Sequence, residues 1–250
     1  MNFDRPTRPA GHVIKGSVVQ AKYEIETYKN LEVLKSGNKK KYLVNAANYP
    51  QMELDLDFLP AAAESYHISA DPRDYILVPL PIVTVDVPNR NLQGFPLEEV
   101  THFDPVYGQM VYQTFQHKPT HVDHVNDDPT QAKGVHVDVG MRTVAKYDTW
   151  KIHVCTIWDR TKDQKLVQDI IDRKRTGYSM GATVIAFHCS ICGKIDNLDA
   201  SSCQHMKNIG GIYGEKRRLA YQVCTGVCYF ETSSVADPAD PTAWSEDVYA

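Results

Sequence analysis

The 250-residue sequence has no apolar run that approaches the 18 residues of a membrane-crossing helix. Its first residues, Met1–Gly11, contain Arg5 and Arg8 and no apolar core, so we expect no secretory signal and an intracellular protein. No cysteine precedes Cys155, which excludes a disulfide framework spread over the chain. The net charge of -4 gives no reason to expect nucleic acid or an anionic membrane as the main partner.

The residues that are present are those of a globular protein. Hydrophobic residues make up 42% and charged residues 23%, and 250 residues are enough to bury a substantial core. Periodicity predicts strands at Val13–Tyr28, Asp74–Val87, Val111–Phe115, Val135–Val139, Thr149–Trp158, Ala182–Phe187 and Tyr221–Tyr229. It predicts helices within Leu54–Tyr66, Phe95–Val100 and Asp163–Lys174. The fold class is therefore a strand-rich α+β domain.

The composition also predicts how the chain is divided. Residues 1–12 read as a flexible lead-in, and residues 13–230 as one domain with a small metal-binding insertion at 188–206. Residues 231–250 have five acidic and no basic residues, and they contain Pro238 and Pro241. We expect this acidic tail to be flexible. Pro79 and Pro81 lie inside the strand at Asp74–Val87, which favours an edge strand or a bend.

One stretch, Arg175–Gly181, places Ser179 between two nearby glycines, Gly177 and Gly181. Glycine permits a sharp turn and a close approach to the hydroxyl, so we expect a turn that presents Ser179. Serine is a weak nucleophile unless a base removes its proton. Taken alone, the stretch favours an ordinary turn over an active site.

A second stretch, His117–Asp138, is rich in histidine and aspartate and has three interpretations. It can supply the base and the orienting carboxylate of a serine hydrolase. It can supply a metallohydrolase site, because His121, Asp123 and His124 resemble part of the metallo-β-lactamase pattern, with Asp138 as a further ligand. Pro119 stands where that pattern has its first histidine. The third interpretation is a solvated polar loop.

The cysteine spacing predicts a metal site. Cys189 and Cys192 form a Cys-x-x-Cys pair, and Cys203 and His205 follow about ten residues later. These four residues suit a tetrahedral zinc ion with no position left for water, so the zinc is expected to be structural. His188, Cys224 or Cys228 could replace His205 as the fourth ligand. Cys155, Cys224 and Cys228 are, however, expected in the core.

Several segments, in order, resemble the prohead proteases of tailed bacteriophages. The segments are Asn89-Arg90-Asn91, Phe95-Pro96, Asp123-His124, Asp128-Pro129-Thr130-Gln131-Ala132 and Gly177-Tyr178-Ser179-Met180-Gly181. A strand and a helix precede the last of these, as in that family. The resemblance covers residues 74–187. It implies a fold similar to the herpesvirus assemblins, with a β-barrel-like core surrounded by helices.

The resemblance also implies an activity. The chain would be a serine endopeptidase that acts in the host cytoplasm inside the immature capsid, on scaffold and internal head proteins. No cofactor would take part in catalysis. The family tends to cleave after glutamate with a small residue two positions earlier. Ala62-Ala63-Glu64 fits that pattern, so self-cleavage is conceivable, as is a homo-oligomer.

Residue by residue, Ser179 matches the nucleophile and His124 the base, with His121 as the competing base. Asp138 is the expected third member and His136 the alternative, because assemblins use a second histidine, which in their chains follows the serine. The Met180 N–H is a natural oxyanion donor. Arg217 and Arg218, in a charged turn, resemble the assemblin arginine pair. The rival classes are the metal-dependent hydrolase and a non-enzymatic, zinc-stabilised phage structural protein.

Overall fold

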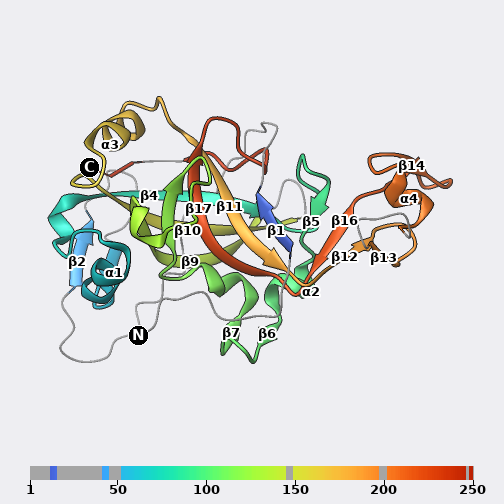
Figure 1. Ribbon diagram of the computed structural model, residues 1–250, viewed down its shortest axis with the longest axis horizontal. Helices are drawn as coiled ribbons and strands as arrows, with labels where there is room; N and C mark the ends of the chain where they lie inside the picture. Colours follow the sequence, from blue (N-terminus) through green and yellow to red (C-terminus); the bar gives the residue numbers. More distant parts are fainter. Residues whose placement is uncertain are drawn as a thin grey trace.

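The computed structural model describes residues 12–15, 41–44, 52–144, 149–196, 202–245 and 248–249. A seven-stranded sheet curls into a half-barrel at the centre of the molecule (Figure 1). In spatial order its strands are β1 (His12–Lys15), β11 (Gly177–Val184), β17 (Cys228–Val235), β8 (Pro119–Val122), β9 (Gly134–Val144), β10 (Thr149–Asp159) and β4 (Tyr75–Thr84). All neighbours are antiparallel except β17 and β8, which are parallel.

The smaller elements surround this sheet. A four-stranded sheet consists of β13 (Ile195–Asp196), β12 (Ala186–Cys189), β16 (Gln222–Thr225) and β5 (Gln93–Gly94). Two-stranded sheets are formed by β2 (Lys41–Val44) with β3 (Met52–Asp55), β6 (Phe103–Asp104) with β7 (Gln109–Met110), and β14 (Ile212–Tyr213) with β15 (Arg218–Leu219). The helices are α1 (Leu59–Tyr66), α2 (Leu97–Thr101), α3 (Gln164–Ile171), α4 (Gln204–Lys207) and the 3₁₀ turns η1 (Pro72–Asp74), η2 (Val111–Phe115) and η3 (Pro129–Gln131).

The strand-rich α+β class and several element predictions are confirmed. Strands β4, β9 and β10 and helix α3 lie where the periodicity predicts them. Strand β4 lies at the edge of the seven-stranded sheet. This agrees with its two prolines, because proline has no N–H to donate to a neighbouring strand. Asp163 caps α3 by accepting the Leu166 N–H at 2.9 Å. The sequence Ala62-Ala63-Glu64 lies inside α1, where a helical backbone opposes cleavage.

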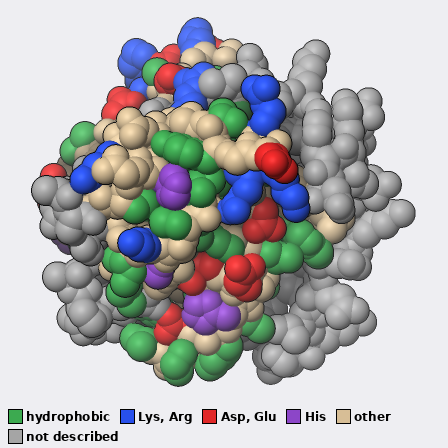
Figure 2. Space-filling view, turned by 90° about the vertical axis from the view of Figure 1, so that its right-hand side faces the viewer, with side chains coloured by type: hydrophobic (Ala, Val, Ile, Leu, Met, Phe, Trp, Pro, Cys, Tyr) green, Lys and Arg blue, Asp and Glu red, His purple; other side chains and the backbone are tan. Residues whose placement is uncertain are grey.

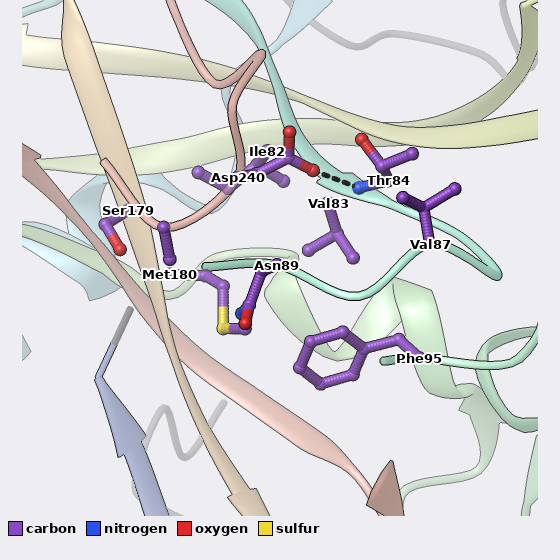
Figure 3. Close-up of a pocket in the computed structure, with 10 residues that line it drawn as sticks. Ile82, Val83, Thr84, Val87, Asn89, Phe95, Ser179, Met180 and Asp240 are labelled. Atoms are coloured by element: carbon purple, nitrogen blue, oxygen red, sulfur yellow. Dashed lines mark hydrogen bonds between the residues drawn. The ribbon is translucent and has the colours of Figure 1, made fainter. Parts of the chain in front are cut away.

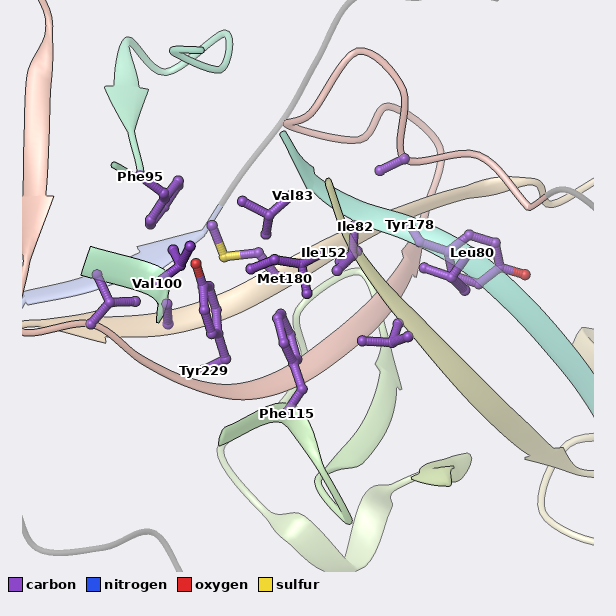
Figure 4. Close-up of a cluster of buried hydrophobic side chains, with 14 of the residues drawn as sticks. Leu80, Ile82, Val83, Phe95, Val100, Phe115, Ile152, Tyr178, Met180 and Tyr229 are labelled. Carbon is purple, nitrogen blue, oxygen red and sulfur yellow. The ribbon is translucent and has the colours of Figure 1, made fainter. Parts of the chain in front are cut away.

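The concave side of the sheet holds the larger apolar core. Trp158 and Tyr178 are fully buried there, and Phe115 stacks on Tyr229 with ring centroids 4.2 Å apart (Figure 4). Phe115 ends η2, so the predicted strand Val111–Phe115 is wrong. Its apolar residues enter the core from a 3₁₀ turn, in which the Thr114 hydroxyl donates to the Val111 carbonyl. A second cluster lies on the opposite face of the sheet, beneath α1.

The stretch that contains Ser179 is strand β11 and not a turn. Its two glycines are needed because neighbouring side chains approach the strand closely, and not because the chain bends there. A Cβ atom on Gly177 would lie 2.7 Å from the Pro238 ring, and one on Gly181 would lie 2.6 Å from a Glu231 carboxylate oxygen. Glycine in a strand often marks such a close approach. The nucleophile candidate is therefore held by a sheet ladder.

The predicted flexible tail is also wrong for the residues that the structure describes. Residues 231–235 complete β17, and residues 237–245 and 248–249 form a segment that we call the C-terminal strap. The Tyr178 N–H donates to Ala243 at 2.8 Å, and Leu77 and Tyr249 exchange backbone hydrogen bonds. The strap thus connects β11 to β4 across the open side of the half-barrel. Backbone pairing and burial of Ala243 outweigh the acidic composition.

A buried carboxylate fixes the strap. Asp240 accepts hydrogen bonds from the Thr84 and Thr242 N–H groups, and its Oδ1 lies 3.5 Å from the Lys151 ammonium. Both side chains of this ion pair are at least nine-tenths buried. A buried charge is tolerated only with such partners.

We expect Asp240→Ala to lower the free energy of unfolding by about 3 kcal/mol, because it removes the carboxylate beside a buried ammonium group. Urea denaturation measures this change. The matched control is Asp237→Asn, which breaks the exposed ion pair with Arg90 and should cost less than about 1 kcal/mol. Equal effects of the two variants would contradict a structural role for the buried pair.

Candidate functional site

Three neighbouring strands bring distant serine and histidine residues onto one face of the sheet. Ser179 on β11 lies opposite Ser233 on β17, and Ser233 lies beside His121 on β8. Residues paired in this way point to the same side of a sheet, and directly opposite Cα atoms are about 4.5–5.5 Å apart in antiparallel strands. This is the face opposite the larger core, because the flanking Tyr178 and Met180 belong to that core.

A buried carboxylate lies on the same face, because Glu231 pairs with Gly181, two residues from Ser179. The Nδ1 atom of His124 is 2.7 Å from Oε1 of Glu231, whose side chain is completely buried. The side chain of His124 is 11% exposed. A carboxylate on Nδ1 fixes the tautomer of an imidazole and leaves Nε2 to accept a proton. The pair has the arrangement of a base and its orienting acid.

Ser233 connects the two members of this pair. Its hydroxyl donates to Oε2 of Glu231 at 2.8 Å and accepts a hydrogen bond from the backbone N–H of His124 at 3.1 Å. Gly181 provides the space for the carboxylate, because a Cβ atom there would lie 2.6 Å from Oε1. The second glycine of the Ser179 stretch is therefore required by Glu231 and not by a turn.

His121 lies beside this pair and is only 2% exposed. Burial lowers the pKa of its imidazole, although the nearby Glu231 carboxylate acts in the opposite direction. His121 is thus held neutral around pH 7. Its Nδ1 has no hydrogen-bond partner among the described residues, whereas Nδ1 of His124 has Glu231. This favours His124 over His121 as the oriented base.

The expected third member, Asp138, is not the carboxylate that contacts His124. Strands β8 and β9 are antiparallel and pair Thr120 with Gly134. From this pair the chain runs towards His124 in one direction along the sheet and towards Asp138 in the opposite direction. The two residues therefore lie on opposite sides of the pair. The Asp138 carboxylate accepts its neighbour's N–H at 2.8 Å, and burial raises the pKa of Asp138. Glu231 occupies the position expected for Asp138.

His136, the alternative third member, belongs to the core. Its side chain is completely buried, its Nδ1 donates to the Phe115 carbonyl at 2.7 Å, and the two rings meet edge to face. Burial lowers the pKa of His136 to about 4. The ring is therefore a neutral structural element.

The backbone N–H of Met180 points away from β17. The Tyr178 N–H donates outward to the strap, and N–H groups two residues apart in a strand point to the same edge. The Met180 N–H thus points to the outer edge of β11, while its side chain lies in the core. At this edge Ser179 and Met180 line a small hollow together with Asn89, Phe95 and Asp240 (Figure 3). The Asn-Arg-Asn and Phe-Pro segments thus lie against the strand of Ser179.

The metallohydrolase pattern is not assembled. Asp123 pairs with Arg175 at 3.1 Å, and the neighbouring His124 pairs with Glu231. Among the described residues the one metal-capable group is the Cys/His cluster. His121, Asp123 and His124 therefore lie close in sequence but serve different contacts.

The Cys/His cluster forms the core of a separate lobe, whose described residues are 186–196 and 202–225, at one end of the molecule (Figure 1). The ligand atoms of Cys189, Cys192, Cys203 and His205 lie within 4.8 Å of one another, so they could hold a metal ion. Nδ1 of His205 is 3.7 Å from the Cys189 sulfur. The predicted set of four ligands is thus confirmed as a cluster, within a lobe larger than the predicted insertion.

The lobe is built around this cluster. Gly193, with φ of 72°, closes the Cys-x-x-Cys turn by donating to the Cys189 carbonyl at 2.8 Å. The Ile191 N–H points at the Cys189 sulfur from 3.4 Å, and the Tyr213 ring packs edge-on against His205. End-on, the molecule presents basic, acidic, hydrophobic and histidine side chains together (Figure 2). No single charge dominates the described part of this face.

Arg217 and Arg218 belong to this lobe and not to the environment of Ser179. They lie at the β14–β15 hairpin, and the Arg218 guanidinium donates to the Ser190 carbonyl beside the cluster. The lobe extends away from the middle of β11 (Figure 1). The assignment of these arginines as oxyanion-stabilising groups is therefore wrong.

Two residues of the site, Glu231 and Ser233, are missing from the sequence prediction. The signal that could have found them is the pattern Tyr229-Phe230-Glu231-Thr232-Ser233, a β-rich run with one acid in it. An acid inside such a run is unusual, because a buried carboxylate needs partners. Cys155, Cys224 and Cys228 are buried, as expected.

Comparison with protein-family models, with curated proteins and with solved structures finds no match to this chain. Among the described residues, no helix has the length and apolar character to cross a membrane.

The buried His136 predicts a pH dependence of stability. Its pKa is about 4 when folded and 6.5 when unfolded, so the unfolded chain binds more protons between these values. Stability is lost as the pH falls through this window. His136→Gln, which retains a donor for Phe115, should reduce the loss between pH 7 and 4.5 by roughly 2.5 kcal/mol. Urea denaturation at pH 7 and at pH 4.5 measures the free energy of unfolding, and the difference between the two values is the loss.

The control for this measurement is His102→Gln, because His102 is exposed. It should keep the full pH dependence. A His136→Gln protein with the same pH dependence as the unaltered chain would contradict the neutral, buried state of His136.

Proposed function

We propose that this chain is a serine endopeptidase with Ser179 as nucleophile, His124 as base and Glu231 as the orienting carboxylate. The observation that supports it most is the 2.7 Å contact between His124 Nδ1 and the fully buried Glu231, on the sheet face that carries Ser179. A base held in this way is what serine needs to become nucleophilic. Glu231 follows the serine in the chain, as does the third member in assemblins.

The reaction is acyl transfer. His124 Nε2 takes the Ser179 hydroxyl proton while the oxygen attacks a peptide carbonyl, and Glu231 stabilises the resulting imidazolium. The Met180 N–H is the candidate donor to the oxyanion, because it points to the outer edge of β11, away from β17. The imidazolium then protonates the leaving amine, and water hydrolyses the acyl-enzyme. Ser179 is 1% exposed, so substrate reaches it only after a covering segment moves.

The physiological substrates follow from the motif order that the chain shares with prohead proteases. We infer that it processes scaffold and internal head proteins inside the immature capsid, after glutamate with a small residue two positions earlier. Asn89, in the Asn-Arg-Asn segment, lines the hollow beside Ser179 and Met180, which supports a role for that segment in substrate binding. The non-enzymatic alternative predicts no covalent chemistry at Ser179.

Two substitutions test the mechanism. Ser179→Ala should abolish cleavage of co-expressed head proteins and labelling by a fluorophosphonate, because the attacking oxygen is absent. Glu231→Gln should slow both by about 10³–10⁴-fold, because the amide cannot stabilise the imidazolium. Intact mass and gel analysis measure these outcomes. Ser233→Ala is the control for the position of the label, which should remain on Ser179. Undiminished cleavage by Ser179→Ala would refute the proposal.

We further propose that the Cys/His cluster holds one structural zinc ion. Three thiolates and an imidazole are a ligand set typical of closed zinc sites. Cys192→Ser should abolish binding of one equivalent of zinc and open the lobe to proteolysis within residues 186–225, because the small core beneath it loses its centre. Metal analysis and limited proteolysis measure this. Cys224→Ala is the control, since Cys224 is a buried cysteine outside the cluster; metal retained by Cys192→Ser would contradict the site.

A further inference from the structure

The base of the candidate active site lies on a turn with an unusual backbone. Asp123 and His124 are consecutive residues with positive φ values of 49° and 59°. Aspartate and histidine are enriched in this region among non-glycine residues, but any non-glycine residue there is uncommon. Such residues cost about 1–3 kcal/mol each and persist only where the surroundings hold them. Something must therefore hold this turn.

Strand β17 holds one side of the turn. The Asp123 N–H donates to the Ser234 carbonyl at 3.0 Å, and the His124 N–H donates to the Ser233 hydroxyl at 3.1 Å. These contacts orient the imidazole towards Glu231, which lies on the same strand. They do not connect the turn to β11, the strand that carries Ser179.

Arg175 supplies that connection. One guanidinium nitrogen of Arg175 lies 3.1 Å from each carboxylate oxygen of Asp123. The Arg175 N–H donates to the Asp169 carbonyl at the end of α3, and β11 begins two residues later at Gly177. Arg175 is thus anchored on the segment that leads into β11, the strand of Ser179. The Arg175 side chain is 24% exposed and the Asp123 side chain 55% exposed.

We propose that Arg175 and Asp123 are positioning residues, which set the distance between His124 and Ser179 by clamping the base-bearing turn to the start of β11. The inference rests on the proposed function for its catalytic meaning. Neither residue touches the reacting atoms. A partly exposed ion pair contributes little to global stability, so its effect should be on geometry and not on folding. Misplacement of a catalytic group by about 1 Å can cost about 100-fold in rate.

The test uses two variants that break the clamp and one matched control. Asp123→Asn removes the charge and keeps a side chain that tolerates positive φ, whereas Arg175→Gln removes the cation. The control is Asp237→Asn, because Arg90 also places one guanidinium nitrogen, at 2.7 and 2.8 Å, on both oxygens of Asp237. That pair joins the Asn-Arg-Asn loop to the strap.

The first readout is the Nδ1–H resonance of His124 in ¹⁵N-histidine-labelled protein, assigned by its loss in Glu231→Gln. A proton shared with a carboxylate resonates far downfield. Both clamp variants should broaden or shift this resonance, and Asp237→Asn should leave it unchanged. The second readout is the rate of fluorophosphonate labelling at Ser179, which should fall about tenfold in both clamp variants with melting temperatures within about 2 °C.

The outcomes separate the two proposals. An unaltered Nδ1–H resonance in both clamp variants overturns the clamp, whatever the enzyme does. No labelling of the unaltered chain overturns the serine mechanism, while a changed resonance in the variants still supports the clamp as a positioning device. An equal change in Asp237→Asn would overturn the clamp as well, because the effect would then be one of general ion-pair loss.

Discussion

The buried carboxylate of Glu231 is the constraint on which the candidate site depends. An ionised carboxylate without partners is too costly to bury, so each neighbour has to be compatible with it. His124 and Ser233 supply hydrogen bonds, and Gly181 leaves the room that any larger residue would fill. These residues come from three segments. The carboxylate therefore fixes how β11, β17 and the turn after β8 fit together.

The pairing of those strands explains which parts of the structure could be predicted from sequence. Helix α3 and strands β4 and β10 follow from local periodicity, because their apolar residues recur at the period of the element. Strand pairing is a property of distant segments, and no local pattern states that β17 lies between β11 and β8. Asp138 was a reasonable expectation from its place on the next strand, yet the antiparallel register carries it away from His124.

The C-terminal segment, residues 231–250, shows that composition alone can also mislead. Acidic residues and two prolines predict flexibility, but Asp237 and Asp240 each pair with a cation, and the backbone of the strap pairs with β11 and β4. The net charge of a segment says nothing about such partners. The Cys/His lobe is the counter-example, since its four ligands lie within 17 residues (189–205) and their spacing alone predicts the cluster. Short-range chemistry is readable from sequence, whereas long-range pairing is not.

If Ser179 is the nucleophile, as proposed, the edges of β11 determine how a substrate approaches it. One edge is occupied by β17. On the other edge β1 pairs from Gly181 onwards, and the strap pairs at Gly177 and Tyr178. Ser179 and Met180 lie between these two partners, at the edge towards which the Met180 N–H points. In the proposed function, a peptide with its carbonyl there would lie between β1 and the strap, so these described segments also border the position of the serine. This arrangement is consistent with the very low exposure of Ser179.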